Sequence, residues 1–474
     1  MYFRRFATQT RNKKQLLMNN YLRLFALLAF ALPVLSFAQK DTIKLSPKST
    51  LKSMGYFRTS LGESLGGGTM AEFKVPGAGA TYRLGNEPNN FGEIGLAYNH
   101  ALNDENNTSL DVVVLFTGFS AYGTGQTFKF DNLGQFYAKM NNIFGDADVW
   151  AGKRFLHRSD FHILNYVWYN VAQESNFGIG IEDINVFNKH AKLGVSLFEF
   201  ENKNIESLKR IDNEAEIEKA NLSSYFVDAR LTDIKTNQDG TLNFWARAST
   251  RKGRADLNLE AANGFGLGAW HEQKNLFDGK ASNHIQTSIR TGITVNQYQY
   301  SGVPVYETYG DPNVRSFDMK KNYTFEISDN FQYEKPKDFA LNFLALYRLD
   351  NRGIEPYNIV TGEKVSVGKN ISWFTAGFRY IKYLHKHFNL ALEVGNDYID
   401  NQTINKHGWM QKITFAPQIS WDYGFYSRPV IRPFVTFANW SESLKGTVGN
   451  YPGTAPFGDK TNGLTYGVSF EIWW

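Results

Sequence analysis

Four aromatic residues in this sequence lie two positions from a polar or charged residue, a spacing that could bind a ligand. The pairs are Tyr56 with Arg58, Phe91 with Glu93, Trp373 with Thr375, and Trp473 with Glu471. Residues two apart on a β-strand point to the same side, so each pair would place a ring beside a hydrogen-bonding group. A ligand with an apolar face and a hydroxylated rim would contact both, and a sugar ring is such a ligand.

Any one of these rings could instead pack against an inward-folded loop or belong to a band of aromatics at a membrane surface. Four rings with the same kind of neighbour favour a path that a solute follows. Charged neighbours would strengthen the hydrogen bonds to the hydroxyl groups of that solute.

The segments that carry these pairs alternate apolar and polar residues, which predicts β-strands with two different faces. The clearest is the C-terminal LTYGVSFEIWW (464–474), in which every second residue from Leu464 to Ile472 is apolar. The alternation recurs in GYFRTSL (55–61), FGEIGLAYNH (91–100), ISWFTAGFRYIKY (371–383) and RPVIRPFVTFANW (428–440). Segments rich in Gly, Asn, Asp, Ser and Thr separate these strands and predict turns and loops.

The apolar set of each strand is rich in aromatic residues and nearly free of charge, which favours a membrane-spanning barrel over a soluble β-sandwich. Without the first 38 residues the chain has 474 − 38 = 436 residues, and at roughly 24 residues per strand and connection this length makes about 18 strands. We therefore expect an all-β, transmembrane antiparallel β-barrel of about 18 strands, wide enough for an aqueous channel. No stretch of the chain suggests a separate plug domain, which argues against an energy-coupled receptor.

Charged residues fix which side of each strand faces the lumen, because a charge on the lipid face costs roughly 2–4 kcal/mol at mid-depth. The residues that must point inward by this rule are Arg58, Glu93, Arg379 and Glu471. The same parity carries Tyr56, Phe91, Trp373 and Trp473 to the lumenal wall.

Residues 1–38 have the features of a secretory signal peptide, with basic residues before an apolar run and cleavage expected after Ala38. Met18 is an alternative start that gives a more typical length. The apolar run from Leu24 to Leu35 is shorter than the roughly 20 residues of a membrane-spanning helix. We expect residues 39–474 to form one barrel domain in the bacterial outer membrane, in contact with its lipid.

Composition and spacing exclude several other functions. The net charge of +5 is small and no Lys/Arg run is interleaved with aromatic residues, which excludes nucleic acid as a partner. The chain has no Cys, so it is not an acylated lipoprotein. No catalytic triad can be argued from spacing, and we expect neither an enzyme nor a cofactor. His157 and His162 lie near Asp160 at a spacing that could suggest a metal site, but a pore-lining role explains them better.

At these residues the sequence resembles the maltoporins, the LamB-type sugar-specific porins. The matching motifs are YRLGNE (82–87), WAGKRF (150–155), RSDFH (158–162), SRPVIRPFVTFANW (427–440) and EIWW (471–474). The resemblance implies an 18-stranded barrel that forms homotrimers, with a loop folded inward to form a constriction. It also implies guided diffusion of maltodextrin-like oligosaccharides along a row of aromatics, the greasy slide, flanked by a polar track.

The resemblance assigns roles to individual residues of this chain. The slide would comprise Tyr56, Phe91, Trp373 and Trp473. The polar track would comprise Arg58, Arg83, Glu93 and Arg158, and the constriction loop would contribute Asp160, His162 and Tyr166. Val167 stands where the family carries a constriction Tyr, so selectivity for maltodextrins does not follow from this loop.

Two other functions fit the same barrel. One is a general or anion-preferring diffusion porin, in which inward arginines select the solute. The other is a barrel that serves mainly for surface attachment or as an enzyme scaffold. The dense run of charges from Glu206 to Lys219 predicts a solvated loop or a short helix in either case.

Overall fold

The computed structural model describes most of the chain from Thr42 onward. The described residues are 42–66, 68–79, 81–103, 107–121, 127–156, 161–164, 175–211, 214–253, 261–295, 307–308, 313–316, 321–353, 356–358, 360–449 and 457–474. The expected signal peptide therefore lies outside the described residues.

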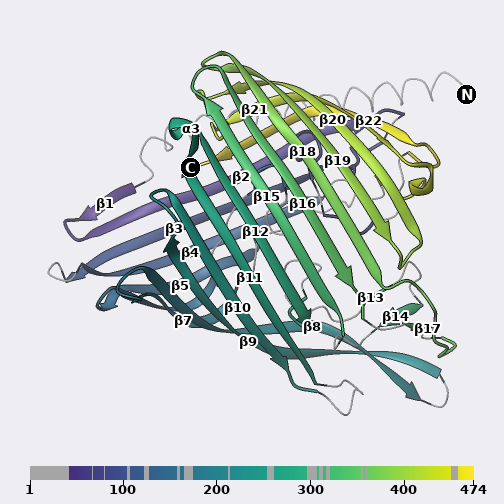
Figure 1. Ribbon diagram of the computed structural model, residues 1–474, viewed down its shortest axis with the longest axis horizontal. Coiled ribbons are helices and arrows are strands. Elements are labelled where there is room, and N and C mark those ends of the chain that lie inside the picture. The colour runs from purple at the N-terminus through teal and green to yellow at the C-terminus, as the bar shows by residue number, and fades with distance from the viewer. Residues whose placement is uncertain are drawn as a thin grey trace, which may run out of the picture.

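Eighteen of the described strands form one closed antiparallel barrel, as the sequence predicted (Figure 1). They are β2 (Ser49–Ser64), β3 (Asn89–Asn103), β4 (Thr108–Ala121), β5 (Asn132–Phe144), β6 (Ala147–Phe155), β7 (Ser175–Val186), β8 (Ala191–Ile211), β9 (Glu214–Lys235), β10 (Gly240–Arg251), β11 (Ala262–Asn275), β12 (Ala281–Gly292), β15 (Tyr323–Lys335), β16 (Phe339–Asn351), β18 (Asn370–His385), β19 (Phe388–Asn401), β20 (Lys406–Ser420), β21 (Val430–Trp440) and β22 (Asn462–Trp473). Each strand pairs with the next along the chain, and β22 pairs with β2 to close the barrel.

Smaller elements lie at the ends of the barrel. β1 (Thr42–Ser46) pairs with the first residues of β2. A three-stranded sheet of β13 (Glu307–Thr308), β14 (Val314–Ser316) and β17 (Tyr357–Asn358) lies among the long connections (Figure 1). The short helices α3 (Leu276–Gly279) and η2 (Glu442–Leu444) follow β11 and β21. In the part of the chain that the structure describes, no helix is long and apolar enough to cross a membrane.

The strands alternate between an exposed apolar face and a buried polar face, which confirms the parity predicted from the charges. On β18, Phe374 is 38% exposed while Thr375 and Arg379 are at most 2% exposed. On β21, Val435 is 48% exposed and Thr436 is fully buried. Apolar side chains thus cover the outside, where the bilayer lies, and charged side chains fill the inside.

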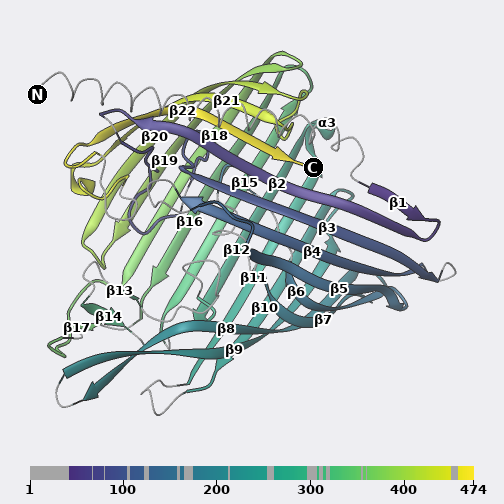
Figure 2. The same cartoon turned by 180° about the vertical axis from the view of Figure 1, so that it is seen from behind.

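The run from Glu206 to Lys219 is neither a loop nor a helix, so that prediction was wrong. β8 continues through Ile211 and β9 begins at Glu214, and the two strands pair over most of their length. Their register sets Glu206 opposite Lys219 and Lys209 opposite Glu216. The count of charges alone did not reveal this pairing. The hairpin extends beyond its neighbours at one corner of the barrel (Figure 2).

Three segments between strands fold into the lumen: residues 70–87, residues 161–164 and the turn 421–429. Residues 70–87, which follow β2, bury Phe73, Val75, Tyr82 and Leu84 against the inner faces of β18 to β21. Their backbone is held there by strand side chains, for example Glu393 Oε1, which accepts from Leu84 N at 2.8 Å, and Thr414, which donates to Leu84 O at 3.0 Å. The sequence predicted one inward loop, and the structure adds this larger segment.

The second inward segment, 161–164, contains the described part of the loop that was expected to form the constriction. Phe161 lies 4.8 Å from the ring of His284 on β12, while His162 lies 5.8 Å from the ring of Trp473 on β22. Consecutive residues therefore contact distant strands of the wall. The segment also joins residues 70–87, because Tyr82 N donates to Ile163 O at 2.8 Å.

Two paired glycines anchor residues 70–87 to the wall. Gly377 on β18 lies opposite Gly395 on β19, and the ring of Tyr82 covers both. A Cβ atom at Gly395 would lie 2.0 Å from Tyr82 Cδ2. Tyr82 OH forms a 2.7 Å hydrogen bond with Thr375 Oγ1. Only a residue without a side chain lets the ring approach the backbone so closely.

We predict that Gly395→Ala displaces Tyr82 and destabilises the folded barrel by about 1–3 kcal/mol, the usual cost of overpacking a well-packed core. Thermal denaturation in detergent measures the change. Gly194→Ala on β8 is the matched control, because the nearest atom to its added Cβ lies 3.5 Å away. Equal stability of the two variants would show that Tyr82 is not held by the glycine pair.

Candidate functional site

Three predicted slide residues come together on the lumenal wall at the seam of the barrel. The ring of Tyr56 on β2 lies 5.8 Å from that of Phe91 on β3 and 6.2 Å from that of Trp473 on β22. Tyr56 pairs directly with Trp473 across the two strands. All three residues are half-buried, so part of each stays accessible to another molecule. We call Tyr56, Phe91, Trp473 and the charged groups that contact them the seam cluster.

A fourth ring, Phe119 on β4, extends this row and was missed from the sequence. Phe119 pairs directly with Phe91 across β3 and β4, so both face the lumen, and Phe119 is 50% exposed. The strand segment VVVLF is apolar on both faces, so alternation alone does not show which of its residues face the lumen. Asp111 on the same strand has the same parity as Phe119, so the charge rule applied to Asp111 would have placed the ring inside.

Two arginines and a glutamate surround the rings of Phe91 and Tyr56 in the seam cluster. The guanidinium of Arg58 lies over Phe91, 5.2 Å from the ring centroid, and is 2.8 Å from Glu87 Oε1. Arg83 donates to Glu87 at 2.6 Å and to the hydroxyl of Tyr56 at 2.8 Å. Burial acts to raise the pKa of Glu87, but Arg58 and Arg83 outweigh it and hold that pKa below its ordinary value. Glu87 therefore stays ionised at neutral pH.

Glu471 accepts hydrogen bonds from several groups of the seam cluster near Trp473. Its carboxylate accepts from Tyr56 OH at 2.9 Å, from Arg428 Nε at 2.7 Å and from Arg432 Nη2 at 2.9 Å. The residue is only 4% exposed. A buried carboxylate is tolerated because these donors satisfy it. Its inward direction was predicted, but its role as a shared acceptor was not.

The turn 421–429 contributes the remaining contacts to Trp473. Arg428 stacks on its ring at 4.1 Å and lies 2.7 Å from His162 Nε2. Tyr426, which is 44% exposed, lies 6.5 Å from the same ring. The sequence named His162 as a site residue and placed Arg428 on the polar side of the alternating segment 428–440, but it gave Arg428 no role in the site and did not indicate Tyr426. Nothing in a turn between strands indicates that it folds inward.

Trp373 lies on the lumenal face as parity predicted, but it is not part of the seam cluster. It is 1% exposed and packs in the core formed with residues 70–87. Its indole Nε1 donates to Asp397 Oδ1 at 3.1 Å, and the same carboxylate accepts from Thr81. The covered ring has no exposed face for a solute.

The other predicted site residues divide into two groups. Glu93 is lumenal and 7% exposed, and it pairs with Tyr56 across β2 and β3. Arg158, Asp160 and Tyr166 lie outside the described residues, as does Val167.

Inward arginines also occur away from the seam, and three of them lie beside carboxylates. Arg230 lies 2.7 Å and Arg247 3.0 Å from Asp228, and Arg348 lies 2.9 Å from Asp350. These pairs reduce the positive potential that the arginines alone would create.

Three carboxylates, Asp148, Glu182 and Asp183, lie close enough to share a cation. Lys139 lies 2.8 Å from Asp148, Arg154 3.0 Å from Glu182 and Lys192 2.8 Å from Asp183. Because each carboxylate already has a basic partner, ion pairing accounts for the group without a metal.

The family model for LamB porins matches residues 51–474 of the chain. The chain belongs to the LamB porin family. Members of this family are channel proteins, and the protein is an outer-membrane channel of the bacterial cell envelope. The match extends from the third residue of β2 to the end of β22 and so includes both strands of the seam.

Solved structures with a similar fold include other outer-membrane barrels. The outer membrane channel DcaP of Acinetobacter baumannii is 11% identical, with 91% of this chain and 100% of that chain covered and a TM-score of 0.45. OmpF of Salmonella typhi, in complex with daunomycin, is 9% identical over 91% and 100% of the chains, with a TM-score of 0.46. Wzi of Escherichia coli, a carbohydrate-binding β-barrel, is 11% identical over 89% and 84%, with a TM-score of 0.38. Identities this low concern the fold alone.

We predict that Glu471→Gln destabilises the barrel by about 3–5 kcal/mol, because Arg428 and Arg432 lose their shared charged acceptor in a buried site. Thermal denaturation in detergent is the measurement. Glu442→Gln is the matched control, since Glu442 is 75% exposed and its pair with Lys445 is worth at most about 1 kcal/mol. A Glu471→Gln barrel as stable as the control would contradict the central role of this carboxylate.

Proposed function

We propose that the channel passes oligosaccharides by guided diffusion along the seam cluster. The observation that carries the proposal is the row of partly exposed rings of Phe119, Phe91, Tyr56 and Trp473 on four adjacent strands. The row begins near the end of β4, where the long connections lie, and reaches the turn 421–429 at the other end of the barrel. Neighbouring rings lie across adjacent strands, and because barrel strands tilt by roughly 35–45° from the barrel axis, the row follows that axis obliquely and covers part of the path that a solute would travel.

The chemistry of the seam cluster suits a neutral, hydroxylated ligand. The C–H face of a sugar ring would stack on an aromatic ring, while its hydroxyl groups would hydrogen-bond to Arg58 and Glu87, which are partly exposed beside Phe91. Several weak sites in series let a solute leave as easily as it enters, which conduction requires. Four rings on consecutive strands supply such a series.

In this proposal the slide differs from the one implied by the family resemblance. Phe119 takes part, and Trp373 acts instead as an anchor for residues 70–87. The track residues Arg58, Arg83 and Glu93 and the loop residue His162 surround the rings. We expect Arg158 to extend the track, and Asp160 and Tyr166 to complete the constriction loop. We expect the functional unit to be a homotrimer in outer-membrane lipid.

A general or anion-preferring diffusion porin is the second candidate. The inward arginines Arg230, Arg247 and Arg348 favour it, although each lies beside a carboxylate. Two carboxylates, Asp228 and Asp350, offset most of the charge of these three arginines, so we predict only weak ion selectivity. Reversal potentials in a tenfold salt gradient, about 59 mV for perfect selectivity, should stay close to zero. A large anion-selective potential that maltodextrins leave unchanged would favour the second candidate.

We predict that Trp473→Ala weakens the block of ion current by maltodextrins about tenfold, since stacking on one aromatic is worth roughly 0.5–1.5 kcal/mol beyond the buried area. Planar bilayer recording with a series of maltodextrins is the measurement. Trp409→Ala is the matched control, because Trp409 is 48% exposed on the outer face of β20. Unaltered sugar block in Trp473→Ala would remove this ring from the path.

We predict that Phe119→Ala also weakens sugar block, by about threefold to tenfold, because a half-exposed ring loses its stacking face. Phe116→Ala on the same strand is the control, since Phe116 is 41% exposed toward lipid. Sugar block and single-channel conductance are measured together, which separates lost binding from a changed pore. Equal effects of the two variants would contradict the placement of Phe119 in the path.

A further inference from the structure

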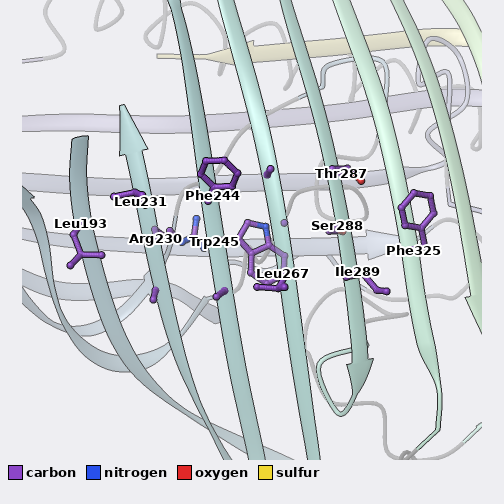
Figure 3. A pocket seen from close by; sticks show the side chains of 14 residues that line it. Leu193, Arg230, Leu231, Phe244, Trp245, Leu267, Thr287, Ser288, Ile289 and Phe325 are labelled. Carbon is purple, nitrogen blue, oxygen red and sulfur yellow. The ribbon is translucent and has the colours of Figure 1, made fainter. Parts of the chain in front are cut away.

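The outer wall of the barrel carries an apolar hollow of about 500 Å³ across strands β8 to β15. Figure 3 shows its side chains on neighbouring strands, with Phe244 and Phe325 well apart and Leu267 and Ile289 between them. Phe244, Leu267 and Ile289 are 41–45% exposed, whereas Arg247 and Arg290 on the same strands are buried in the lumen. The hollow therefore opens to the outside of the barrel.

Small residues create the hollow. Ala229 pairs with Ala246 across β9 and β10, and Ala269 pairs with Thr287 across β11 and β12. The two pairs are offset by two residues along the strands, because Ala246 lies opposite Leu267 and Phe244 lies opposite Ala269. Leu231 and Phe244 therefore border the first pair, and Leu267 and Ile289 border the second. The result is a trough across four strands, roughly 14 Å long at about 4.8 Å per strand spacing.

The lining offers nothing to a polar ligand. The outward side chains are alanines, leucines, isoleucine and phenylalanines, with one exception. The exception is Thr287, whose hydroxyl already donates to the backbone oxygen of Glu326 at 3.1 Å. Arg230, Trp245 and Ser288 alternate with the outward residues and belong to the lumenal face, where all three are buried. A sugar or a headgroup would find no free partner here.

We propose that this hollow is a binding site for one acyl chain of an outer-membrane lipid. The hollow lies near the middle of its strands, so in the membrane it faces hydrocarbon rather than headgroups. Its length of roughly 14 Å accommodates a stretch of one acyl chain. The site is continuous with the apolar outer face that already contacts the bilayer.

Packing rather than the hydrophobic effect selects the chain. Lipid tails are as apolar as leucine, so transfer from bilayer to hollow gains little by itself. A chain that fits the trough gains dispersion contacts with alanine and phenylalanine atoms that a void would forfeit. We therefore expect a lipid in the hollow to exchange with bulk lipid more slowly than a lipid elsewhere on the outer wall. We also expect it to bind there with a modestly higher affinity.

Site-directed labelling tests the proposal directly, because the natural chain contains no Cys. Ala246→Cys places a fluorescent label in the hollow, and Ala376→Cys places one on the outer face of β18, away from it. Quenching is titrated with phospholipids that carry bromine on the acyl chain. We expect half-maximal quenching at Ala246→Cys to need about threefold less brominated lipid than at Ala376→Cys.

The second measurement uses a variant in which a larger side chain fills the hollow. Ala269→Phe adds a ring to the trough, and Ala345→Phe on β16 is the matched control outside it. Native mass spectrometry of the detergent-extracted channel should show one retained lipid lost in Ala269→Phe alone, with conductance unchanged in both.

Equal quenching at the two cysteines and equal retained lipid would reduce the hollow to ordinary bilayer contact and overturn the proposal. Protection of Ala246→Cys from brominated lipid, with assembly impaired by Ala269→Phe, would instead assign the hollow to a second copy of the chain and would also overturn it.

Discussion

A strand that crosses a bilayer exposes half of its side chains to hydrocarbon, where an ionised group costs roughly 2–4 kcal/mol. Strands β18 and β21 follow this constraint, with exposed phenylalanine and valine outside and buried arginine and threonine inside. The same constraint concentrates charge in a narrow interior. Those charges must then be paired there, and the pairing determines what else the lumen can hold.

Buried ion pairs connect the inward segments to the wall. Glu471 on the last strand accepts from Arg428 in a turn, and Arg428 contacts His162 in the inward loop. Glu393 on β19 accepts both from Arg379 and from the backbone of Leu84. Residues 70–87 are further fixed by the Tyr82 ring on its two glycines. The lumen is therefore filled against β18 to β21 by a segment with its own apolar core, and the partly exposed rings lie at the seam beside it.

The outer and inner faces of one wall consequently suit different molecules. Inside, rings beside charges offer stacking and hydrogen bonds to a hydroxylated solute. Outside, the same alternation leaves only apolar contacts, and a group of alanines shapes them into a hollow. Alternate residues of the same strand form the two faces. On β10, Trp245 and Arg247 are lumenal, while Phe244 and Ala246 face lipid.

The sequence alone determined the barrel, its approximate strand number and the parity of its charged strands, because alternation and the cost of a charge in lipid are local properties. It placed Tyr56, Phe91 and Trp473 on the inner wall for that reason. Tertiary structure decided which inward rings stay exposed: residues 70–87 cover Trp373, whereas Phe119 remains open. It also brought Glu87, Arg428 and Tyr426 to the seam. Which loop folds inward depends on contacts between residues hundreds of positions apart, and no local pattern carries that information.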